Sequence, residues 1–421
     1  MTKRKNKKST RIENNYALIM AIRNNDIENV EKLLKIPSVN PTIFNNECIR
    51  LASFNGFTQI VKLLLAWIGP NRQTVDPIMT VGNTYTCLLS AIINSHIEII
   101  KMLLAWQGLN GEYINPADDN MSIILAISNN NLEITNILLE WRGLNGEFID
   151  LTVENNLPIV LPIKNGYNDI ILSLLNWTGP NGEYIDMSIF NIFYLAILNN
   201  RVETLQILLE WRGRNGEYVD PSMESNWAIT NSSMAGYTEI VEMLLKWVGP
   251  NGERVNPTDY DNSAIKWASK NGYKRTVKML LDWKNVNNIA IDYTVLIVCI
   301  REASVNNFNN IVEMILDDNR IKSNITCNDL ELLHREKYIQ PYLINTLKCF
   351  VLDREKIKCN NIRDPIEQKE SLIAINRARI ELNCPSLRRD MDIINMELVM
   401  KTGNIGEKIP TELFSSISKY L

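Results

Sequence analysis

The amino-acid sequence predicts an all-α solenoid of about nine helix-turn-helix units, with long hairpin-like fingers between the units and a helical extension after them. Three observations predict this fold. Tryptophan recurs at intervals of 34 to 39 residues, an apolar ladder precedes most of these tryptophans, and a second short helical pattern lies upstream of each ladder. One such unit cannot bury its apolar face alone, so neighbouring units are expected to stack.

The first helix of a unit is predicted from a short apolar pattern that ends in a turn, as in Leu51–Gly56 and Trp267–Gly272. A small residue recurs where two helices would approach closely, at Ala52, Ala91, Ala126, Ala196 and Ala268. A left-handed residue is expected to end this helix, and glycine suits that conformation. The glycines in this position are Gly56, Gly166, Gly236 and Gly272.

The second helix is predicted from apolar residues at i, i+3 and i+4, as in Ile60-Val61-x-Leu63-Leu64-Leu65. It ends at the recurring tryptophan. A stacking surface for bases or sugars is one interpretation of this series, but recognition needs residues that differ between repeats. We therefore interpret the tryptophans as structural; they are Trp67, Trp106, Trp141, Trp177, Trp211, Trp247 and Trp283.

The finger follows the tryptophan in phrases such as Trp106-Gln-Gly-Leu-Asn-Gly-Glu-Tyr. Asn-Gly is a strong hairpin-turn signal, and it occurs at 110–111, 145–146, 181–182, 215–216 and 251–252. The position after Asn-Gly-Glu has two open interpretations. It either binds a protein at the edge of the concave face, as Tyr and Arg often do, or packs on the neighbouring finger. Its residues are Tyr113, Phe148, Tyr184, Tyr218 and Arg254.

Nine units can be placed along the chain, and the first and ninth depart from the pattern, as capping units do. They lie near 13–36, 45–67, 83–106, 120–141, 155–177, 190–211, 226–247, 261–283 and 293–318.

These motifs resemble ankyrin repeats over roughly residues 13–318: the Ile60–Leu65 ladder, the Asn-Gly-Phe or Asn-Gly-Tyr turn before it, and the Val-Asp or Val-Asn pair after the finger. Two features depart from the family. The Thr-Pro-Leu-His opening is degraded, with 263–266 the nearest match, and the finger is about three residues longer than a 33-residue repeat allows. The divergent, Asn-rich form is similar to the ankyrin arrays of large DNA viruses, those of mimivirus-like and poxvirus-like viruses. The resemblance implies a module that binds a protein on its concave surface, which would be a host protein if the chain is viral. We also expect a monomer.

The residues that carry catalytic chemistry are sparse. The two histidines, His96 and His334, lie far apart, and no C-x-x-C pair, Gly-Lys-Ser/Thr phosphate loop or His-Glu-x-x-His motif occurs. We therefore expect no enzyme, no metal site and no cofactor. The seven cysteines are scattered, which predicts reduced thiols in an intracellular protein.

Six basic residues and no acid lie within residues 1–12, whereas the whole chain has a net charge of −4. This arm is predicted to be a solvated, disordered tail; a nuclear-localisation signal or an acidic-partner contact is the alternative. The acidic body argues against a nucleic-acid partner. No apolar run reaches the 18 residues of a membrane helix, so we expect a cytoplasmic protein, with the nucleus as the alternative.

Residues 319–408 are expected to form a helical extension, and residues 409–421 a further helix with an apolar stripe. This last segment resembles the opening of an F-box, shortened as in poxvirus ankyrin proteins. The resemblance implies docking to the Skp-type adaptor of a cullin ubiquitin ligase. Ser371–Ile380 is loosely similar to a SOCS box, which also recruits a cullin. The alternatives are a capping helix and a stand-alone scaffold. The docking residues would be Pro410, Glu412, Leu413, Ile417 and Leu421.

Overall fold

The computed structural model describes residues 2–79, 86–118, 120–152, 157–187, 192–284, 290–335, 348–349, 351–352 and 365–381. Within these ranges the regular structure is helical, and the strand-like pairing consists of isolated β-bridges. This confirms the predicted all-α solenoid. The chain divides into two compact units, Met1–Val219 and Asp220–Leu421.

The described residues of the first unit form six helix pairs. Each first helix contacts its own second helix, and like helices of successive pairs contact one another. The pairs are α1 (Thr2–Arg23) with α2 (Ile27–Leu34), α3 (Ile43–Phe54) with α4 (Thr58–Leu65), α5 (Cys87–Ile93) with α6 (Ile97–Leu104), α7 (Met121–Ser128) with α8 (Leu132–Glu140), α9 (Leu157–Asn165) with α10 (Asn168–Asn176), and α11 (Phe193–Leu198) with α12 (Val202–Glu210).

The second unit continues the pattern with three pairs and then a helical extension. The pairs stack in the same way, and α19 packs against both helices of the last pair. The pairs are α13 (Met223–Ala235) with α14 (Thr238–Lys246), α15 (Asp259–Lys270) with α16 (Lys274–Asp282), and α17 (Tyr293–Val305) with α18 (Asn309–Leu316). The extension contains α19 (Asn319–Asn324), α20 (Cys327–Arg335) and α22 (Pro365–Glu381).

The core of each unit lies between the helix pairs. The predicted apolar ladder is buried, as in α14, where Ile240, Val241 and Leu244 are fully covered. Burying a side chain of this size stabilises the fold by about 1.5–3 kcal/mol. The recurring alanine is also fully buried in each of its five repeats, which confirms the close approach of the helices there.

A left-handed residue joins the two helices of every pair. Gly56, Gly166, Gly236 and Gly272 have φ between +76° and +84°, as predicted. Asparagine is the non-glycine residue that adopts this conformation most readily, and serine is a rarer choice. This gives part of the chain's high asparagine content a structural reason. The other five pairs have Asn25, Ser95, Asn130, Asn200 and Asn307 in this position.

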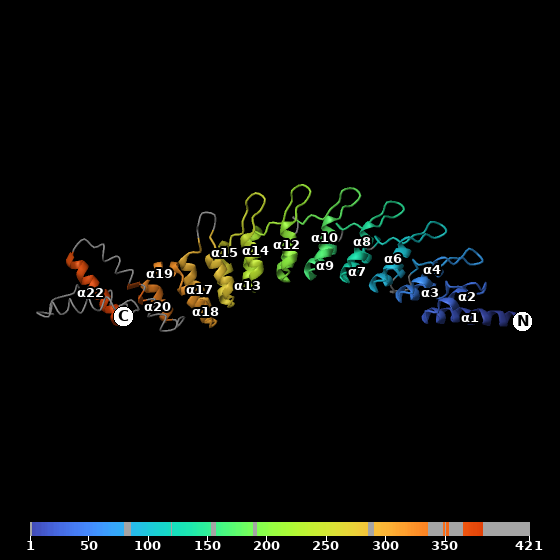
Figure 1. The fold of residues 1–421 in the computed structure, drawn as a ribbon, viewed down its shortest axis with the longest axis horizontal. Helices are drawn as coiled ribbons and strands as arrows, with labels where there is room; N and C mark the ends of the chain where they lie inside the picture. Colours follow the sequence, from blue (N-terminus) through green and yellow to red (C-terminus); the bar gives the residue numbers. More distant parts are fainter. Residues whose placement is uncertain are drawn as a thin grey trace. The chain divides into compact units, whose positions relative to one another are not determined.

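The fingers are short hairpins that project from one edge of the helices in each unit (Figure 1). In four of the described fingers a β-bridge joins the two arms, as between Gln107 and Tyr113 and between Val248 and Arg254. The residue pair that follows each finger also has a structural role. In Val75-Asp76, Val75 is buried and the Asp76 carboxylate accepts a 2.9 Å hydrogen bond from the Ile78 backbone, which forms an Asx turn.

The N-terminal segment differs from the prediction. Residues 1–12 were expected to be a disordered arm, but α1 begins at Thr2. The segment contains neither Gly nor Pro, and Lys and Arg favour helix. The docking residues expected within 409–421 lie outside the described residues, whereas the segment similar to a SOCS box lies in α22.

The cysteines also differ in part from the prediction. Cys48, Cys87 and Cys299 are free thiols, and burial raises the pKa of each to about 12, so they are unreactive. Cys349 is disulfide-bonded, so the prediction of seven reduced thiols is wrong there. Spacing along the sequence does not show which cysteines the tertiary structure brings together.

Candidate functional site

Each finger is closed by its own backbone. In the finger that follows Trp177, the Gly179 N–H donates to the Glu183 carbonyl at 2.9 Å, and the Gly182 N–H donates to the Gly179 carbonyl at 3.0 Å. Gly182 has φ +91°, and a Cβ there would meet nothing within 4 Å. Its backbone conformation, not lack of space, therefore requires glycine. A left-handed residue after a tight turn is typical of a three-residue hairpin loop.

The glutamate of the Asn-Gly-Glu motif locks this loop. Glu183 accepts hydrogen bonds from the Asn181 backbone at 2.9 Å and from the Asn181 side chain at 2.8 Å. The Asn181 side chain is the main reason that the pKa of Glu183 lies below its usual value. The carboxylate covers Gly179 so closely that a Cβ there would come within 2.3 Å of it. We call the Asn-Gly-Glu motif the frame of the finger, because the hydrogen bonds between its asparagine and its glutamate close the loop from within.

The recurring tryptophan packs against the base of its finger. A Cβ on the glycine two residues later would lie 2.5 Å from the Trp67 ring and 2.8 Å from the Trp247 ring. Trp177 and Trp247 are buried, with 7% and 8% of their surface exposed. Trp177 also stacks on Phe148 of the preceding finger, with ring centroids 6.3 Å apart. These contacts explain the spacing of the Trp-x-Gly motif.

The predicted finger residues link neighbouring fingers in the first unit. The Tyr184 hydroxyl donates a 2.8 Å hydrogen bond to Glu217 of the next finger, and the Tyr113 hydroxyl donates in the same way to Glu147. The hydroxyl of Tyr113 is the main cause that lowers the pKa of Glu147 to about 2. All these tyrosine rings are half-buried. The structure thus gives the rings a packing role between fingers.

The remaining predicted residues are placed differently. The Arg212 guanidinium of the same finger lies 5.8 Å from the centroid of the Tyr218 ring, a cation–π arrangement. Arg254 is exposed at the second arm of its finger, in the second unit.

The tip of the finger was not predicted from the sequence; it is the residue before Asn-Gly or, in the first finger, before Asn71-Arg72. Leu109 and Leu144 each expose 58% of their surface at this position. The residue changes from finger to finger while the frame around it stays the same, and that variability is the signal that could have identified it. The exposed tips are Pro70, Leu109, Leu144, Pro180, Arg214 and Pro250.

A second exposed feature lies at the start of some first helices. In α3, Phe44 exposes 51% of its surface and lies 5.8 Å from the ring of Tyr16, which is 54% exposed. In α15, Tyr260 is 73% exposed. Both aromatic residues begin a run of three left-handed residues, a conformation that costs roughly 1–2 kcal/mol per residue. Strain of this kind is found where the chain serves a function.

Buried asparagine side chains hold two of these left-handed turns. Asn46 in α3 accepts a 3.0 Å hydrogen bond from the Asp76 backbone of the next repeat. In α13, which has the same left-handed run, Asn226 accepts one of 2.7 Å from the Asn256 backbone and donates one of 2.6 Å to Asp259. These bonds offset part of the backbone strain and connect consecutive repeats.

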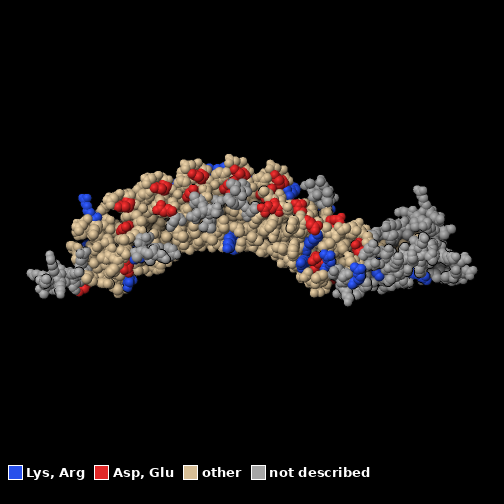
Figure 2. Space-filling model, turned by 180° about the vertical axis from the view of Figure 1, so that it is seen from behind, with Lys and Arg blue, Asp and Glu red and all other residues tan. Residues whose placement is uncertain are grey.

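Charge is unevenly distributed over the surface. Figure 2 shows Asp and Glu mainly along the edge that carries the fingers, and its densest group of Lys and Arg lies on the second unit.

The described residues were also considered as a metal site or a membrane-spanning segment. The Nε2 atom of His96 lies within hydrogen-bond distance of the Phe54 carbonyl oxygen, at 3.0 Å. Within the described ranges no three His, Cys, Asp or Glu residues are grouped as a metal site would need. A search of the same residues for a membrane-spanning helix found none of sufficient length and apolar character.

Comparison with known proteins agrees with this geometry. The family described as "Ankyrin repeats (3 copies)" matches residues 18–118, 49–153 and 192–294, which together cover more than half of the chain. Among solved structures, the crystal structure of the human ASB11 ankyrin repeat domain is similar, with 19% identity and a TM-score of 0.31. That similarity covers 51% of this chain and 95% of the human domain. A search of curated proteins found no match.

Proposed function

Because the chain belongs to the ankyrin-repeat family, whose repeats are protein–protein interaction modules, we propose that it binds a partner protein along its finger tips and the exposed starts of its first helices. The observation that carries this proposal is the exposure of Phe44 and Tyr260, two aromatic side chains held in solvent by strained turns. Exposed aromatic residues of this kind are favoured at binding hot spots.

The rigidity of the fingers supports the same surface. Five of the described loops are closed by an Asn-Gly-Glu frame, at 110–112, 145–147, 181–183, 215–217 and 251–253. Tyr113 and Tyr184 join their fingers to the next ones. A preformed surface loses little conformational freedom on binding, so more of the contact energy appears as affinity. We propose that the exposed parts of Tyr113, Phe148, Tyr184, Tyr218 and Arg254 contribute to this surface together with the variable tips.

We further propose that residues 409–421 couple the bound protein to a cullin ubiquitin ligase. The support is the similarity of this segment to the first helix of an F-box, in which an apolar stripe docks to a Skp-type adaptor. The docking residues would be Pro410, Glu412, Leu413, Ile417 and Leu421. The alternative is a stand-alone scaffold that tethers or sequesters its target without a ligase.

The binding surface is tested by two matched substitutions on one helix. Phe44 and Phe54 lie near opposite ends of α3 and expose 51% and 54% of their surface. Affinity capture with quantitative mass spectrometry should show that Phe44→Ala reduces recovery of the target about tenfold, whereas Phe54→Ala leaves it unchanged. Both variants should melt as the parent does, because neither side chain is buried. Equal recovery by all three proteins would exclude the surface around Phe44.

The ligase link is tested by the same capture with a chain that ends at Glu407. Recovery of a cullin and its adaptor by the full chain alone would support the receptor function. If both chains recover the same target and neither recovers a cullin, the protein is a scaffold.

A further inference from the structure

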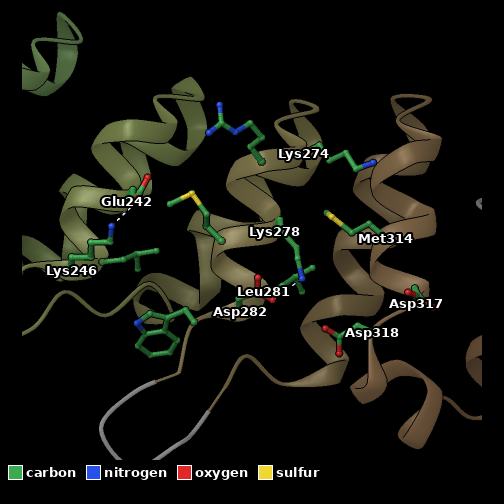
Figure 3. Close-up of a pocket in the computed structure, with 13 residues that line it drawn as sticks. Glu242, Lys246, Lys274, Lys278, Leu281, Asp282, Met314, Asp317 and Asp318 are labelled. Carbon is green, nitrogen blue, oxygen red and sulfur yellow. Dashed lines mark hydrogen bonds and ion pairs between the residues drawn. The ribbon is translucent and has the colours of Figure 1, made fainter.

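The second helices of the second unit form a groove that the finger surface does not include. It has a volume of about 920 Å³ and lies over α14, α16 and α18 (Figure 3). Its apolar lining includes Leu245, Met279 and Met314, and Trp283 adds an aromatic ring. Methionine adapts its shape to different partners and is common on binding surfaces.

Every acidic residue of this groove has a basic partner. Glu242 pairs with Lys246 at 2.5 Å, and Asp282 pairs with Lys278 at 2.8 Å, as the dashed lines of Figure 3 show. Asp318 pairs with Arg320 at 2.7 Å, and Asp317 pairs with Lys322.

Two basic residues of the groove remain. Lys274 and Arg275 are exposed, and no residue in the described ranges forms an ion pair with either of them. The lining itself holds four acidic and four basic residues. Two of the acids, Asp318 and Asp317, pair with Arg320 and Lys322 from outside the lining, so the groove and its ion-pair partners together carry two more positive than negative charges. The charge of Arg275 also acts on Glu242, whose closer partner is Lys246.

The position of Arg275 departs from the rest of the array. The second residue of the second helix is Asp or Glu in six of the nine pairs, namely in α2, α6, α8, α10, α12 and α14. A carboxylate is stabilised there by the partial positive charge of the helix N-terminus, and a cation is destabilised. In α16 this position and the one before it are Arg275 and Lys274. The chain thus tolerates an unfavourable charge on one helix, next to the groove.

We propose that this groove binds an acidic peptide segment of a partner protein, with carboxylates on Lys274 and Arg275 and a large apolar side chain between Met279 and Met314. Three packed helices span about 16–20 Å, the length of five or six extended residues. The combination of charge and thioether lining favours a mixed acidic and apolar segment over a simple anion. This surface is separate from the finger surface, so either can fail without the other.

The test compares the full chain with two charge-matched variants. Arg275→Glu restores the acid that six other second helices have, so it should fold at least as well as the parent. Lys62→Glu makes the same change of charge on α4, where Lys62 is exposed and outside every ion pair of the described residues. Random peptides displayed on phage are selected on each protein, and the selected peptides are then synthesised and titrated by fluorescence anisotropy.

We expect the parent and Lys62→Glu to select peptides that combine Asp or Glu with Leu, Met or Phe. Arg275→Glu should bind these peptides at least about tenfold more weakly. A matched peptide with serine in place of its apolar residues should also bind less tightly to the parent. Selection of basic peptides, of no consensus, or of the same peptides on all three proteins would overturn the proposal.

Discussion

The Tyr184 hydroxyl lies 2.8 Å from the carboxylate of Glu217, a residue that closes the loop of the next finger. The Glu217 carboxylate therefore closes its own finger and also accepts a hydrogen bond from the neighbouring finger. Because this arrangement recurs between Tyr113 and Glu147, the two pairs allow matched predictions.

The free energy of unfolding should fall in acid, because protonation of Glu147 and Glu217 weakens the hydrogen bonds that their carboxylates accept. Hydrogen bonds lower the pKa of Glu147 and of Glu217 from 4.5 to about 2. A depressed folded-state pKa stabilises the fold above pH 4.5, and this contribution is lost as the pH falls toward 2. Thermal melts from pH 6 to pH 2 should show this loss, and Glu147→Gln should make the profile flatter. An unchanged profile would contradict the role of the carboxylate.

The two tyrosines should differ in their effect on these pKa values. The Tyr113 hydroxyl is the largest cause of the shift at Glu147, whereas the Asn215 side chain is the largest at Glu217. Tyr113→Phe should therefore raise the pKa of Glu147 more than Tyr184→Phe raises that of Glu217. Carboxyl chemical shifts followed by NMR through a pH titration measure both. Equal shifts would mean that the two finger pairs are held alike.

Trp177→Ala should destabilise the first unit by about 3 kcal/mol or more, because the ring is buried against its finger and against Phe148. Denaturation in urea, followed by circular dichroism, measures the change. The buried indole N–H has no hydrogen-bond partner among the described residues. Trp177→Phe keeps most of the ring contact and removes this donor, so its loss should be clearly smaller. A melt unaffected by Trp177→Ala would refute the structural role.

Two glycines allow the cost of a left-handed backbone to be distinguished from the cost of a steric clash at Cβ. Gly252 has φ +90° with nothing within 4 Å of a Cβ, whereas Gly236 has φ +76° and a Cβ there would lie 2.4 Å from the Tyr273 ring. Gly252→Ala should lower stability by roughly 1–2 kcal/mol, the ordinary penalty of a left-handed alanine. Gly236→Ala should lower it further. Equal losses in thermal denaturation would show that Tyr273 moves aside freely.

At Asn226, the contribution of the side-chain hydrogen bonds to stability can be separated from the cost of the left-handed backbone. Its buried side chain bonds both the Asn256 backbone and Asp259. Asn226→Ala should lower stability by about 1–3 kcal/mol, because the Asn256 backbone N–H loses its acceptor. Asn226→Gly loses the same bonds but relaxes the left-handed backbone, so it should be less damaging than alanine. The opposite order in urea titrations would show that the turn is not strained.

The repeat architecture was predictable because each local signal agrees with the fold. Trp177, the ladder before it and the Asn-Gly pair after it repeat, and their spacing alone implies stacked helix pairs. The glycines that join the helices were identified for the same reason, since a left-handed residue is a local requirement.

The candidate site was less predictable because its contacts join residues far apart in sequence. The partner of the Tyr184 hydroxyl is 33 residues away and is determined by how two fingers stack. The left-handed turn at Phe44 contradicts the intrinsic preference of phenylalanine, so no propensity argument would place it there. The charge of α16 became informative only when Arg275 was aligned with the acids of the other second helices.

The closed frame of the finger is held by residues other than the one at its tip. Its glycines, asparagine and glutamate satisfy one another, and a tip residue such as Leu109 takes no part in that closure. Arg214 differs, because its guanidinium donates to the Thr178 hydroxyl and lies over the Tyr184 ring of the preceding finger. A substitution at a tip such as Leu109 should therefore leave the closed loop intact. If the tips bind the partner as proposed, substitutions there can alter the binding surface while the frame that presents it is kept.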